Sequence, residues 1–460
     1  MMLMLSAAAD SMHGQLLGND RIFDGVSTDT RTLREGELFV ALEGPNFDGG
    51  DYVSQAKEKG AAAAVVGSQV EGDLAQIAVA DTKLALGQLG AAWRRDKSAV
   101  VIGITGSNGK TTLKELTAAC LSQAAPTIAT EGNLNNDIGM PLMLTRIDET
   151  HRYAVLEMGA NHAGEIDYLT SLAEPDVVAI TNAAAAHLEG FGSIAGVAKA
   201  KGEILRAKSR PGVAILNADD AYFEYWSAMV ADIDVIGFGI QAQTDVRASD
   251  IAADGGGSNF QLHLYDTGID VRLSLPGQHN IRNACAAAAI AVALGVAPEQ
   301  IRSGLESVKP VAGRLQPKRG LYGATLFDDS YNANPLSVIA AAEFLAGLEG
   351  QSWLVLGDMA ELGANTDRLH QDVGAAVKKA GVKQLFATGE LSRNVTDAFG
   401  DHAVWFDSVD TLIDALRVSI TSDVNVLVKG SRFMRMERVV AALTSTDASG
   451  GGSSNALVPD

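Results

Sequence analysis

The stretch Val101-Ile-Gly-Ile-Thr-Gly-Ser-Asn-Gly-Lys-Thr-Thr112 decides the fold, because an apolar run ends in glycines and then in a lysine and two threonines. The apolar run predicts a buried strand, and the residues from Lys110 onward predict a helix. Glycines between them let backbone N–H groups turn toward phosphate oxygens, and the helix offers its positive N-terminal end. Lys110 can then reach the outer phosphates and Thr111 can hold Mg²⁺. The stretch therefore predicts a loop that binds the phosphates of a nucleoside triphosphate.

The loop departs from the usual phosphate-loop pattern. Gly-x-x-x-x-Gly-Lys would place a glycine at position 104, where this chain has isoleucine, so only the shorter Gly106-x-x-Gly109-Lys110-Thr111 remains. Taken alone, this pattern also fits a glycine turn that precedes a helix and binds nothing. The choice between the two interpretations depends on the other motifs.

Composition indicates a soluble enzyme with more than one core. The chain has 460 residues, of which 47% are hydrophobic and 20% charged, which suits an α/β enzyme and excludes wholesale disorder. The net charge of −20 argues against general binding to nucleic acid or to anionic membranes. An anionic small substrate needs only a locally basic pocket. We expect no nucleic-acid partner and a monomer.

The cysteines and the chain start indicate a cytoplasmic protein. Cys120 and Cys285 lack the spacing of a metal site, so we expect both to be reduced and buried. Residues 1–9 are apolar but carry no basic residue and are followed at once by Asp10, which predicts no signal peptide. Charges and glycines interrupt every alanine-rich run, so we expect no membrane-spanning segment.

Strand and helix signals alternate along the chain and predict an α/β protein of three domains. We expect a small N-terminal α/β substrate domain at 1–84, a central P-loop-type ATPase domain with a parallel sheet at 85–312, a C-terminal Rossmann-like α/β domain at 313–445, and a disordered tail at 446–460. In such sheets, ligands bind at the carboxyl ends of the strands.

Apolar runs locate the individual elements. In the central domain we expect strands at 100–105, 153–158, 177–181 and 212–217, and helices at 82–95, 194–207 and 280–294. Apolar and polar residues alternate within 244–274, which predicts antiparallel strands. In the last domain we expect strands at 324–327, 353–356, 384–387, 403–406 and 425–428.

Three kinds of residue in the central domain could carry chemistry. Glu157 ends an apolar run, where a carboxylate can complete a Mg²⁺ shell with Thr111 or merely cap a turn. His187 lies in a glycine-flanked loop and is either a metal ligand or an ordinary loop histidine. Lys199 and Lys201, by composition alone, form an exposed helix face.

Five stretches carry a family resemblance when read in order: Thr105-Gly-Ser-Asn-Gly-Lys-Thr-Thr112, Gly132-Asn-Leu-Asn-Asn-Asp-Ile-Gly139, Glu157-Met-Gly-Ala-Asn-His162, His187 and Leu275-Pro-Gly-Gln-His-Asn-Ile-Arg-Asn283. Together they resemble the Mur ligases, the ATP-dependent amide-forming enzymes of bacterial peptidoglycan synthesis. The missing first glycine of the phosphate loop is also a feature of that family. The resemblance extends from about Val26 to Leu443.

Further motifs resemble one branch of this family, the one that adds D-alanyl-D-alanine. They are Val26-Ser-Thr-Asp-Thr-Arg31 with Phe39-Val-Ala-Leu-Glu-Gly44, Asp328-Asp-Ser-Tyr-Asn-Ala-Asn-Pro335 and Leu356-Gly-Asp-Met-Ala-Glu-Leu-Gly363. The Asp-Asn-Pro-Arg motif typical of the preceding ligase is absent. A folylpolyglutamate-synthase-like ligase would lack the uridine-binding first domain, and a phosphate-loop GTPase would carry an Asn-Lys-x-Asp motif that is also absent.

The resemblance implies an ATP-dependent, ADP-forming ligase that uses Mg²⁺. It would join UDP-N-acetylmuramoyl-tripeptide, whose third residue is diaminopimelate or lysine, to D-alanyl-D-alanine. ATP would first phosphorylate the carboxylate, and the amine of the dipeptide would then attack the acyl phosphate. A last domain that closes over the site would keep water from that intermediate.

The resemblance also implies residue roles. The implied ATP contacts are Gly106, Ser107, Asn108, Gly109, Lys110, Thr111, Thr112, His279, Asn283, Arg314, Asp329 and Tyr331. The implied metal ligands are Thr111, Glu157, His187 and a carbamylated Lys201. The implied substrate contacts are Ser27, Thr28, Asp29, Thr30 and Arg31 for the uridine diphosphate, with Asn135, Asn136, Asn332 and Asn334. Lys110, Lys201, His187 and Arg314 would be catalytic, Arg314 reaching toward the γ-phosphate.

Overall fold

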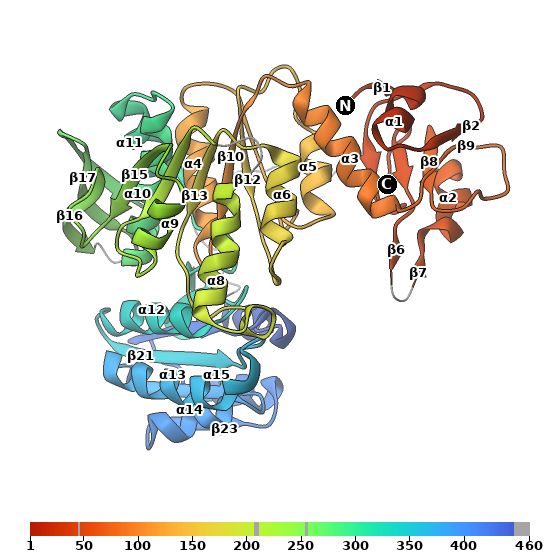
Figure 1. The fold of residues 1–460 in the computed structure, drawn as a ribbon. Coiled ribbons are helices and arrows are strands. Elements are labelled where there is room, and N and C mark those ends of the chain that lie inside the picture. The colour runs from red at the N-terminus through yellow and green to blue at the C-terminus, as the bar shows by residue number, and fades with distance from the viewer. Residues whose placement is uncertain (45–46, 207–210, 254–255, 446–460) are drawn as a thin grey trace, which may run out of the picture. The chain divides into compact units, whose positions relative to one another are not determined.

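The computed structural model describes residues 1–44, 47–206, 211–253 and 256–445 (Figure 1). The chain forms two compact units, the first of residues 1–309 with 361–364 and the second of 310–360 with the residues from 365 onward. The expected tail at 446–460 lies outside the described residues. Within the described ranges, none of the helices combines the length and apolarity needed to cross a membrane.

The first unit begins with a five-stranded sheet in the order β2-β9-β8-β5-β4. Its strands are β2 (Gln15–Leu17), β9 (Ala75–Ala78), β8 (Ala63–Val66), β5 (Leu38–Val40) and β4 (Val26–Ser27). Helices α1 (Leu5–Ser11), α2 (Val53–Glu58) and α3 (Thr82–Arg95) accompany it, and short antiparallel pairs form between β1 (Leu3–Met4) and β3 (Ile22–Phe23) and between β6 (Glu43–Gly44) and β7 (Phe47–Asp48). Every residue of β8 is buried, which explains its alanine and valine composition.

A nine-stranded sheet organises the rest of the first unit, in the order β11-β12-β10-β13-β14-β15-β16-β17-β18. Its strands are β11 (Thr127–Ala129), β12 (Tyr153–Glu157), β10 (Val100–Thr105), β13 (Val177–Ile180), β14 (Val213–Asn217), β15 (Asp234–Gly239), β16 (Val246–Ala253), β17 (Ser258–Leu264) and β18 (Thr267–Leu273). Pairing is parallel from β11 to β16 and antiparallel between the last three strands. The predicted strands are confirmed, and the period-two segment extends the same sheet.

Helices cover both faces of this sheet. On one face, α4 (Lys110–Ser122) and the alanine-rich α10 (Gln278–Ala293) lie against each other, with α11 (Pro298–Ser307) beside α4. The other face carries α5 (Gly139–Thr145), α6 (Glu165–Ala173), α7 (Leu188–Phe191), α8 (Ile194–Lys201) and α9 (Phe223–Met229). The helix predicted at 194–207 is shorter than expected, because α8 ends at Lys201 and a 3₁₀ helix, Gly202–Arg206, follows.

The two cysteines lie in the core between the sheet and its helices α4 and α10. Cys120 and Cys285 are both fully buried among aliphatic side chains, as the sequence predicted. Burial raises the pKa of each thiol to about 12. At neutral pH both groups are therefore inert thiols that act as small apolar side chains.

The second unit contains a six-stranded sheet in the order β19-β20-β24-β21-β22-β23. Its strands are β19 (Gln316–Arg319), β20 (Thr325–Asp329), β24 (Val424–Lys429), β21 (Gln351–Gly357), β22 (Gln384–Thr388) and β23 (Ala403–Phe406), and its helices are α12 (Pro335–Ala346), α13 (Thr366–Ala380), α14 (Ser392–Phe399), α15 (Val409–Ser419) and α16 (Glu437–Leu443). All pairs are parallel except the edge pair β19–β20. The predicted strands are confirmed, whereas β19, a polar edge strand with a proline, was not predicted.

Candidate functional site

The phosphate loop follows β10, which lies between β12 and β13 in the sheet. Gly106 has φ +145° and Gly109 has φ +82°, values that favour glycine. Close packing also requires glycine at both positions. A Cβ atom on Gly106 would lie 1.8 Å from Thr181 Oγ1, and a Cβ atom on Gly109 would lie 2.6 Å from Asn283 Oδ1. Only glycine fits these two places, which lets the backbone approach a ligand closely.

Lys110 begins helix α4 directly after the loop. Its Nζ donates to the carbonyl oxygen of Gly106 at 2.8 Å and lies 3.4 Å from that of Ser107. The ammonium therefore curls back over the loop, as it must to meet a phosphate held there. Thr112 is half-buried on the same turn of α4.

Sequence reasoning missed the residues that hold the loop. Asn182 accepts the backbone N–H of Asn108 at 3.1 Å and donates to its carbonyl at 3.1 Å, pairing with both backbone groups. Thr181 Oγ1 donates to the same carbonyl at 2.6 Å, and the Ser107 N–H donates to the Asn182 carbonyl at 3.0 Å. Asn217 Nδ2 in turn donates to the Thr181 carbonyl at 2.8 Å. The only sequence signal was that Thr181 and Asn182 lie at the end of a predicted strand.

Thr111 and Glu157 form the predicted oxygen pair beside the loop. Thr111 Oγ1 donates to Glu157 Oε2 at 2.9 Å, and Asn135 Nδ2 donates to Glu157 Oε1 at 2.8 Å. Glu157 is 3% exposed. Its carboxylate accepts hydrogen bonds from neutral donors, and among the residues that the structure describes it has no ion-pair partner. A buried carboxylate with a hydroxyl beside it suits Mg²⁺, which prefers oxygen ligands.

The Mg²⁺ shell would be completed from outside the protein. Across the residues that the structure describes, no three histidine, cysteine or carboxylate side chains gather to hold a metal ion. Mg²⁺ typically takes one or two protein ligands and fills its octahedron with phosphate oxygens and water. The Thr111–Glu157 pair fits that mode of binding.

Lys201 is not on an exposed helix face, so the composition-based interpretation is wrong for this residue. It is 1% exposed, while Lys199 is exposed as expected. Two positions apart on a helix, the side chains point about 200° from one another, so one face of α8 is buried and the other is not. Lys201 Nζ lies 3.5 Å from the Ala160 carbonyl and 5.1 Å from the ring centroid of Phe191.

Burial changes the acid–base behaviour of Lys201 and His187. Desolvation, reinforced by the charge of Lys110, lowers the pKa of Lys201 to about 7. The pKa of His187 is also lowered, first by desolvation and further by the charges of Lys110 and Lys201, while the Glu361 carboxylate against its ring opposes the shift. In both groups the shift enlarges the neutral fraction at neutral pH, and the neutral form is the one that reacts with CO₂ or binds a metal. The first unit brings these two residues to the same locality as Lys110.

Helix α10 supplies the remaining predicted nucleotide contacts of this unit. Asn283 is buried, and its side-chain amide lies against Gly109 of the loop. His279 is half-buried in the first turn of α10, where its ring lies against Gly277. Asn136 instead lies just before helix α5, its Oδ1 accepting the N–H of Gly139, the first residue of that helix, at 2.9 Å.

The five residues predicted to bind uridine diphosphate run from Ser27, the last residue of β4, through the turn that follows it. Arg31 and Asp29 form a bidentate ion pair with a shortest distance of 2.7 Å, and hydrogen bonding from Arg31 lowers the pKa of Asp29. Thr30 donates to Gln55 Oε1 at 2.7 Å, and Ser27 is buried. Thr28 is half-buried between them. The turn presents an exposed guanidinium of fixed direction, which suits a phosphate.

The predicted residues of the second unit gather around the carboxyl end of β20. The Arg314 guanidinium lies 4.3 Å from the centroid of the Tyr331 ring. Asp329 pairs with Lys429, a buried residue that sequence reasoning missed, at 2.8 Å. Asn332 is exposed, and Asn334 caps α12 by accepting the Ser337 N–H at 3.0 Å.

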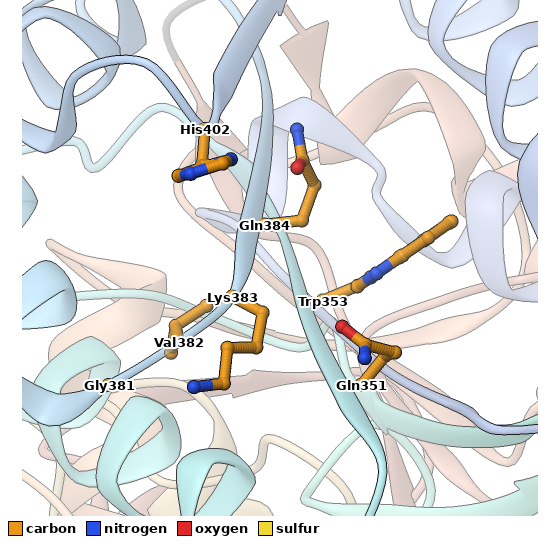
Figure 2. Close-up of a pocket in the computed structure, with 7 residues that line it drawn as sticks. All are labelled: Gln351, Trp353, Gly381, Val382, Lys383, Gln384 and His402. Atoms are coloured by element: carbon orange, nitrogen blue, oxygen red, sulfur yellow. The ribbon is translucent and has the colours of Figure 1, made fainter.

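The second unit also has a surface cavity of about 470 Å³, which Figure 2 shows. It is lined by Gln351, Trp353, Gly381, Val382, Lys383, Gln384 and His402. Gln351 and Gln384 begin β21 and β22, so the cavity lies at the amino ends of the parallel strands. None of its lining residues belongs to the predicted site, whose residues follow the carboxyl ends.

Three family descriptions match the chain in order. "Mur ligase family, catalytic domain" matches residues 23–94, "Mur ligase middle domain" matches 104–291, and "Mur ligase, glutamate ligase domain" matches 313–432. The match at 23–94 covers the segment that a folylpolyglutamate-synthase-like ligase would be expected to lack. That alternative and the GTPase alternative are both wrong.

Full-length relatives agree with these matches. UDP-N-acetylmuramoyl-tripeptide–D-alanyl-D-alanine ligase of Escherichia coli (strain K12) is 45% identical over 95% of this chain and 98% of its own. A solved UDP-N-acetylmuramoylalanyl-D-glutamyl-2,6-diaminopimelate–D-alanyl-D-alanyl ligase from Acinetobacter baumannii is 36% identical, with a TM-score of 0.84 over 95% of this chain and 97% of that one.

A further solved structure, MurF ligase from Thermotoga maritima in complex with ADP, is 26% identical. Its TM-score is 0.81 over 91% of this chain and 96% of that one. The resemblance seen in the motifs and the predicted α/β architecture are thus confirmed. With the family's domains matched in order and a 45% identical relative along 95% of its length, this chain belongs to the Mur ligase family, in the branch of the MurF ligases.

Proposed function

We propose that this chain joins UDP-N-acetylmuramoyl-tripeptide to D-alanyl-D-alanine, with ATP converted to ADP and phosphate, in a cytoplasmic step of peptidoglycan synthesis. The E. coli relative, 45% identical, supports the choice of substrates. The observation that carries the chemistry is the buried Thr111–Glu157 pair beside the phosphate loop and Lys110. A test is phosphate release from ATP, which is expected only when both the nucleotide-tripeptide and the dipeptide are present.

The reaction requires an activated carboxylate. In this proposal the terminal carboxylate of the tripeptide attacks the γ-phosphorus of ATP, and ADP leaves. The amine of the dipeptide then attacks the acyl carbon, loses a proton, and expels phosphate. Loop N–H groups from Gly106 to Gly109 and the Lys110 ammonium bind and align the triphosphate, which is the main demand of phosphoryl transfer.

We infer that Thr111 and Glu157 hold one Mg²⁺, and that His187 and a carbamylated Lys201 serve a second. Bound Mg²⁺ supplies positive charge that neutralises the phosphate oxygens. The oxygen pair and the lowered pKa values of Lys201 and His187 support these assignments. Contacts of ATP with His279, Asn283, Arg314, Asp329 and Tyr331 belong to the same proposal.

We propose that substrate recognition is divided among three domains, 1–84, 85–312 and 313–445. Substitution of Arg31 with alanine is expected to weaken the UDP-substrate and leave the KM for D-alanyl-D-alanine nearly unchanged, because its guanidinium is exposed in the first domain. Asn332→Ala is expected to do the opposite. Steady-state kinetics with each substrate varied in turn measure both effects, and equal effects of the two changes on the UDP-substrate KM contradict the division.

We further propose that the third residue of the tripeptide is diaminopimelate. The A. baumannii relative, 36% identical over 95% of this chain, carries diaminopimelate in its name. An assay with the diaminopimelate and the lysine forms of the nucleotide substrate, in parallel, is expected to give the higher kcat/KM with the diaminopimelate form. A higher value with the lysine form excludes this assignment and leaves the ligase reaction itself intact.

A further inference from the structure

The turn that carries Arg314 has an unfavourable backbone. Leu315, the next residue, has φ +49°, a left-handed conformation that bulky side chains rarely adopt. Its side chain is only 3% exposed. Gly313 has φ +73°, so residues on both sides of Arg314 have left-handed backbone. A conformation of this kind persists only where neighbouring groups hold it.

Asp329 and Lys429 stabilise the left-handed backbone at Leu315. Asp329 Oδ1 accepts the backbone N–H of Leu315 at 3.1 Å, and Asp329 Oδ2 accepts from Lys429 Nζ at 2.8 Å. Lys429 Nζ also donates to the Asn332 carbonyl at 2.8 Å. The side chains of Lys429 and Asp329 are 4% and 17% exposed, so solvent screens the ion pair little. Both carboxylate oxygens of Asp329 are thus engaged within the second unit.

The same turn fixes where Arg314 points. The Tyr331 N–H donates to the Gly313 carbonyl at 3.1 Å, which brings the tyrosine beside the turn. The Arg314 guanidinium then lies 4.3 Å from the centroid of the Tyr331 ring, within the range of a cation–π contact. The Lys429–Asp329 ion pair and the Asp329–Leu315 hydrogen bond therefore connect Lys429 to the turn that carries Arg314.

We propose that Lys429 is a positioning residue for the phosphoryl transfer. It fixes Asp329, Asp329 fixes the strained turn at Leu315, and the turn presents the Arg314 guanidinium in one orientation to the outer phosphate of ATP. This inference rests on the proposed function, because the contact of Arg314 with ATP comes from there. A charge held in place before the reaction stabilises the transition state without reorganisation.

A double-mutant cycle tests the proposal. Turnover at saturating substrates is measured for Lys429→Met, Arg314→Ala and the double variant. Each single change is expected to lower kcat by about 100-fold, the scale of a misplaced catalytic group. The double variant is expected to be no slower than Arg314→Ala, because Lys429 acts through Arg314.

The neighbouring ion pair of Lys318 and Asp328 provides the matched control. These groups are 2.7 Å apart on β19 and β20, but neither one bonds the Leu315 backbone in the described contacts. Lys318→Met is expected to leave kcat within about twofold, the scale of an ordinary partly exposed pair. If Lys429→Met melts below the assay temperature, Lys429→Gln replaces it in the cycle, since its side-chain amide can still donate a hydrogen bond toward Asp329 while the charge is removed.

A binding measurement separates positioning from stability. Lys429→Met and Arg314→Ala are expected to reduce, by the same factor, the preference for a non-hydrolysable ATP analogue over ADP. Losses in kcat that multiply in the double variant, or a preference unchanged by Lys429→Met, overturn the inference and leave the ligase function standing. If Arg314→Ala keeps the wild-type kcat, Arg314 has no role in the phosphoryl transfer, and this inference is wrong as well. Absence of phosphate release from the wild type with both substrates present overturns the proposed function instead.

Discussion

Replacing Lys201 with alanine is expected to leave almost no turnover, with a loss of more than about 100-fold, the upper end for residues that tune a metal site. An ammonium at this position would repel two Mg²⁺ ions, whereas a carbamate is an anion that can orient or bind one. The carbamate forms when the neutral amine attacks CO₂, making an N–C bond and releasing one proton. The lowered pKa of Lys201, about 7, makes that amine available.

The measurement is turnover of Lys201→Ala with and without a small carboxylic acid in solution. Partial recovery is expected, because an acetate or formate anion can occupy the space left by the carbamate. Lys199→Ala is the matched control, since that side chain is exposed two residues away, and it is expected to behave as wild type. Full activity of Lys201→Ala in CO₂-depleted buffer contradicts the assignment.

The same pKa sets a direction for pH dependence. Below about pH 7 most Lys201 side chains are protonated, and above it most are neutral. Because only the neutral amine reacts with CO₂, activation by added bicarbonate is expected to grow as pH rises through this value. The comparison is made at constant dissolved CO₂, and an activation that falls with rising pH argues against carbamate formation.

Lys110→Ala is expected to depress the chemical step far more than binding of the UDP-substrate. Its ammonium lies over the phosphate loop, 2.8 Å from the Gly106 carbonyl, where the outer phosphates are expected. Loss of one preorganised contact to developing charge costs roughly 2.7–4 kcal/mol, or about 10²–10³ in rate. The check is kcat at saturating ATP beside the dissociation constant for the UDP-substrate.

Near-normal turnover of Lys110→Ala at saturating ATP would remove the phosphate-loop assignment. A melting curve serves as the control for folding, since the ammonium of the half-buried Lys110 donates to the Gly106 carbonyl and its loss could loosen the loop. If the melting temperature falls together with kcat, Lys110→Arg, which keeps the charge, distinguishes loss of charge from loss of fold.

Much of the architecture could be predicted because its signals are local. Strand β10 is an apolar run that ends in glycines, so its bounds, Val100–Thr105, match the predicted range. Strand β19 could not be predicted, because Gln316-Pro-Lys-Arg319 carries no apolar alternation. It pairs at the sheet edge with β20, and such an edge position tolerates polar residues and a proline.

The sequence could locate residues of the candidate site only where the residue type and its position next to a predicted element were enough to indicate it. The place of Glu157 beside the loop could be predicted because a carboxylate ends a buried strand there, whereas its metal role stays a prediction. Burial of Lys201 could not, since composition does not reveal which face of α8 is covered. The roles of Asn182 and Lys429 could not be predicted for another reason. Their hydrogen-bond partners are backbone groups or side chains that lie 74 to 100 residues away in the chain.

The buried cysteines give this chain a natural reporter of its own unfolding. The sequence holds two cysteines, Cys120 and Cys285, and both lie in the core of the first unit. A thiol with a pKa near 12 and no exposure cannot react with an alkylating reagent until that core opens. The labelling rate therefore reads the opening of the first unit alone, while the second unit can unfold and refold without leaving any mark on the thiols.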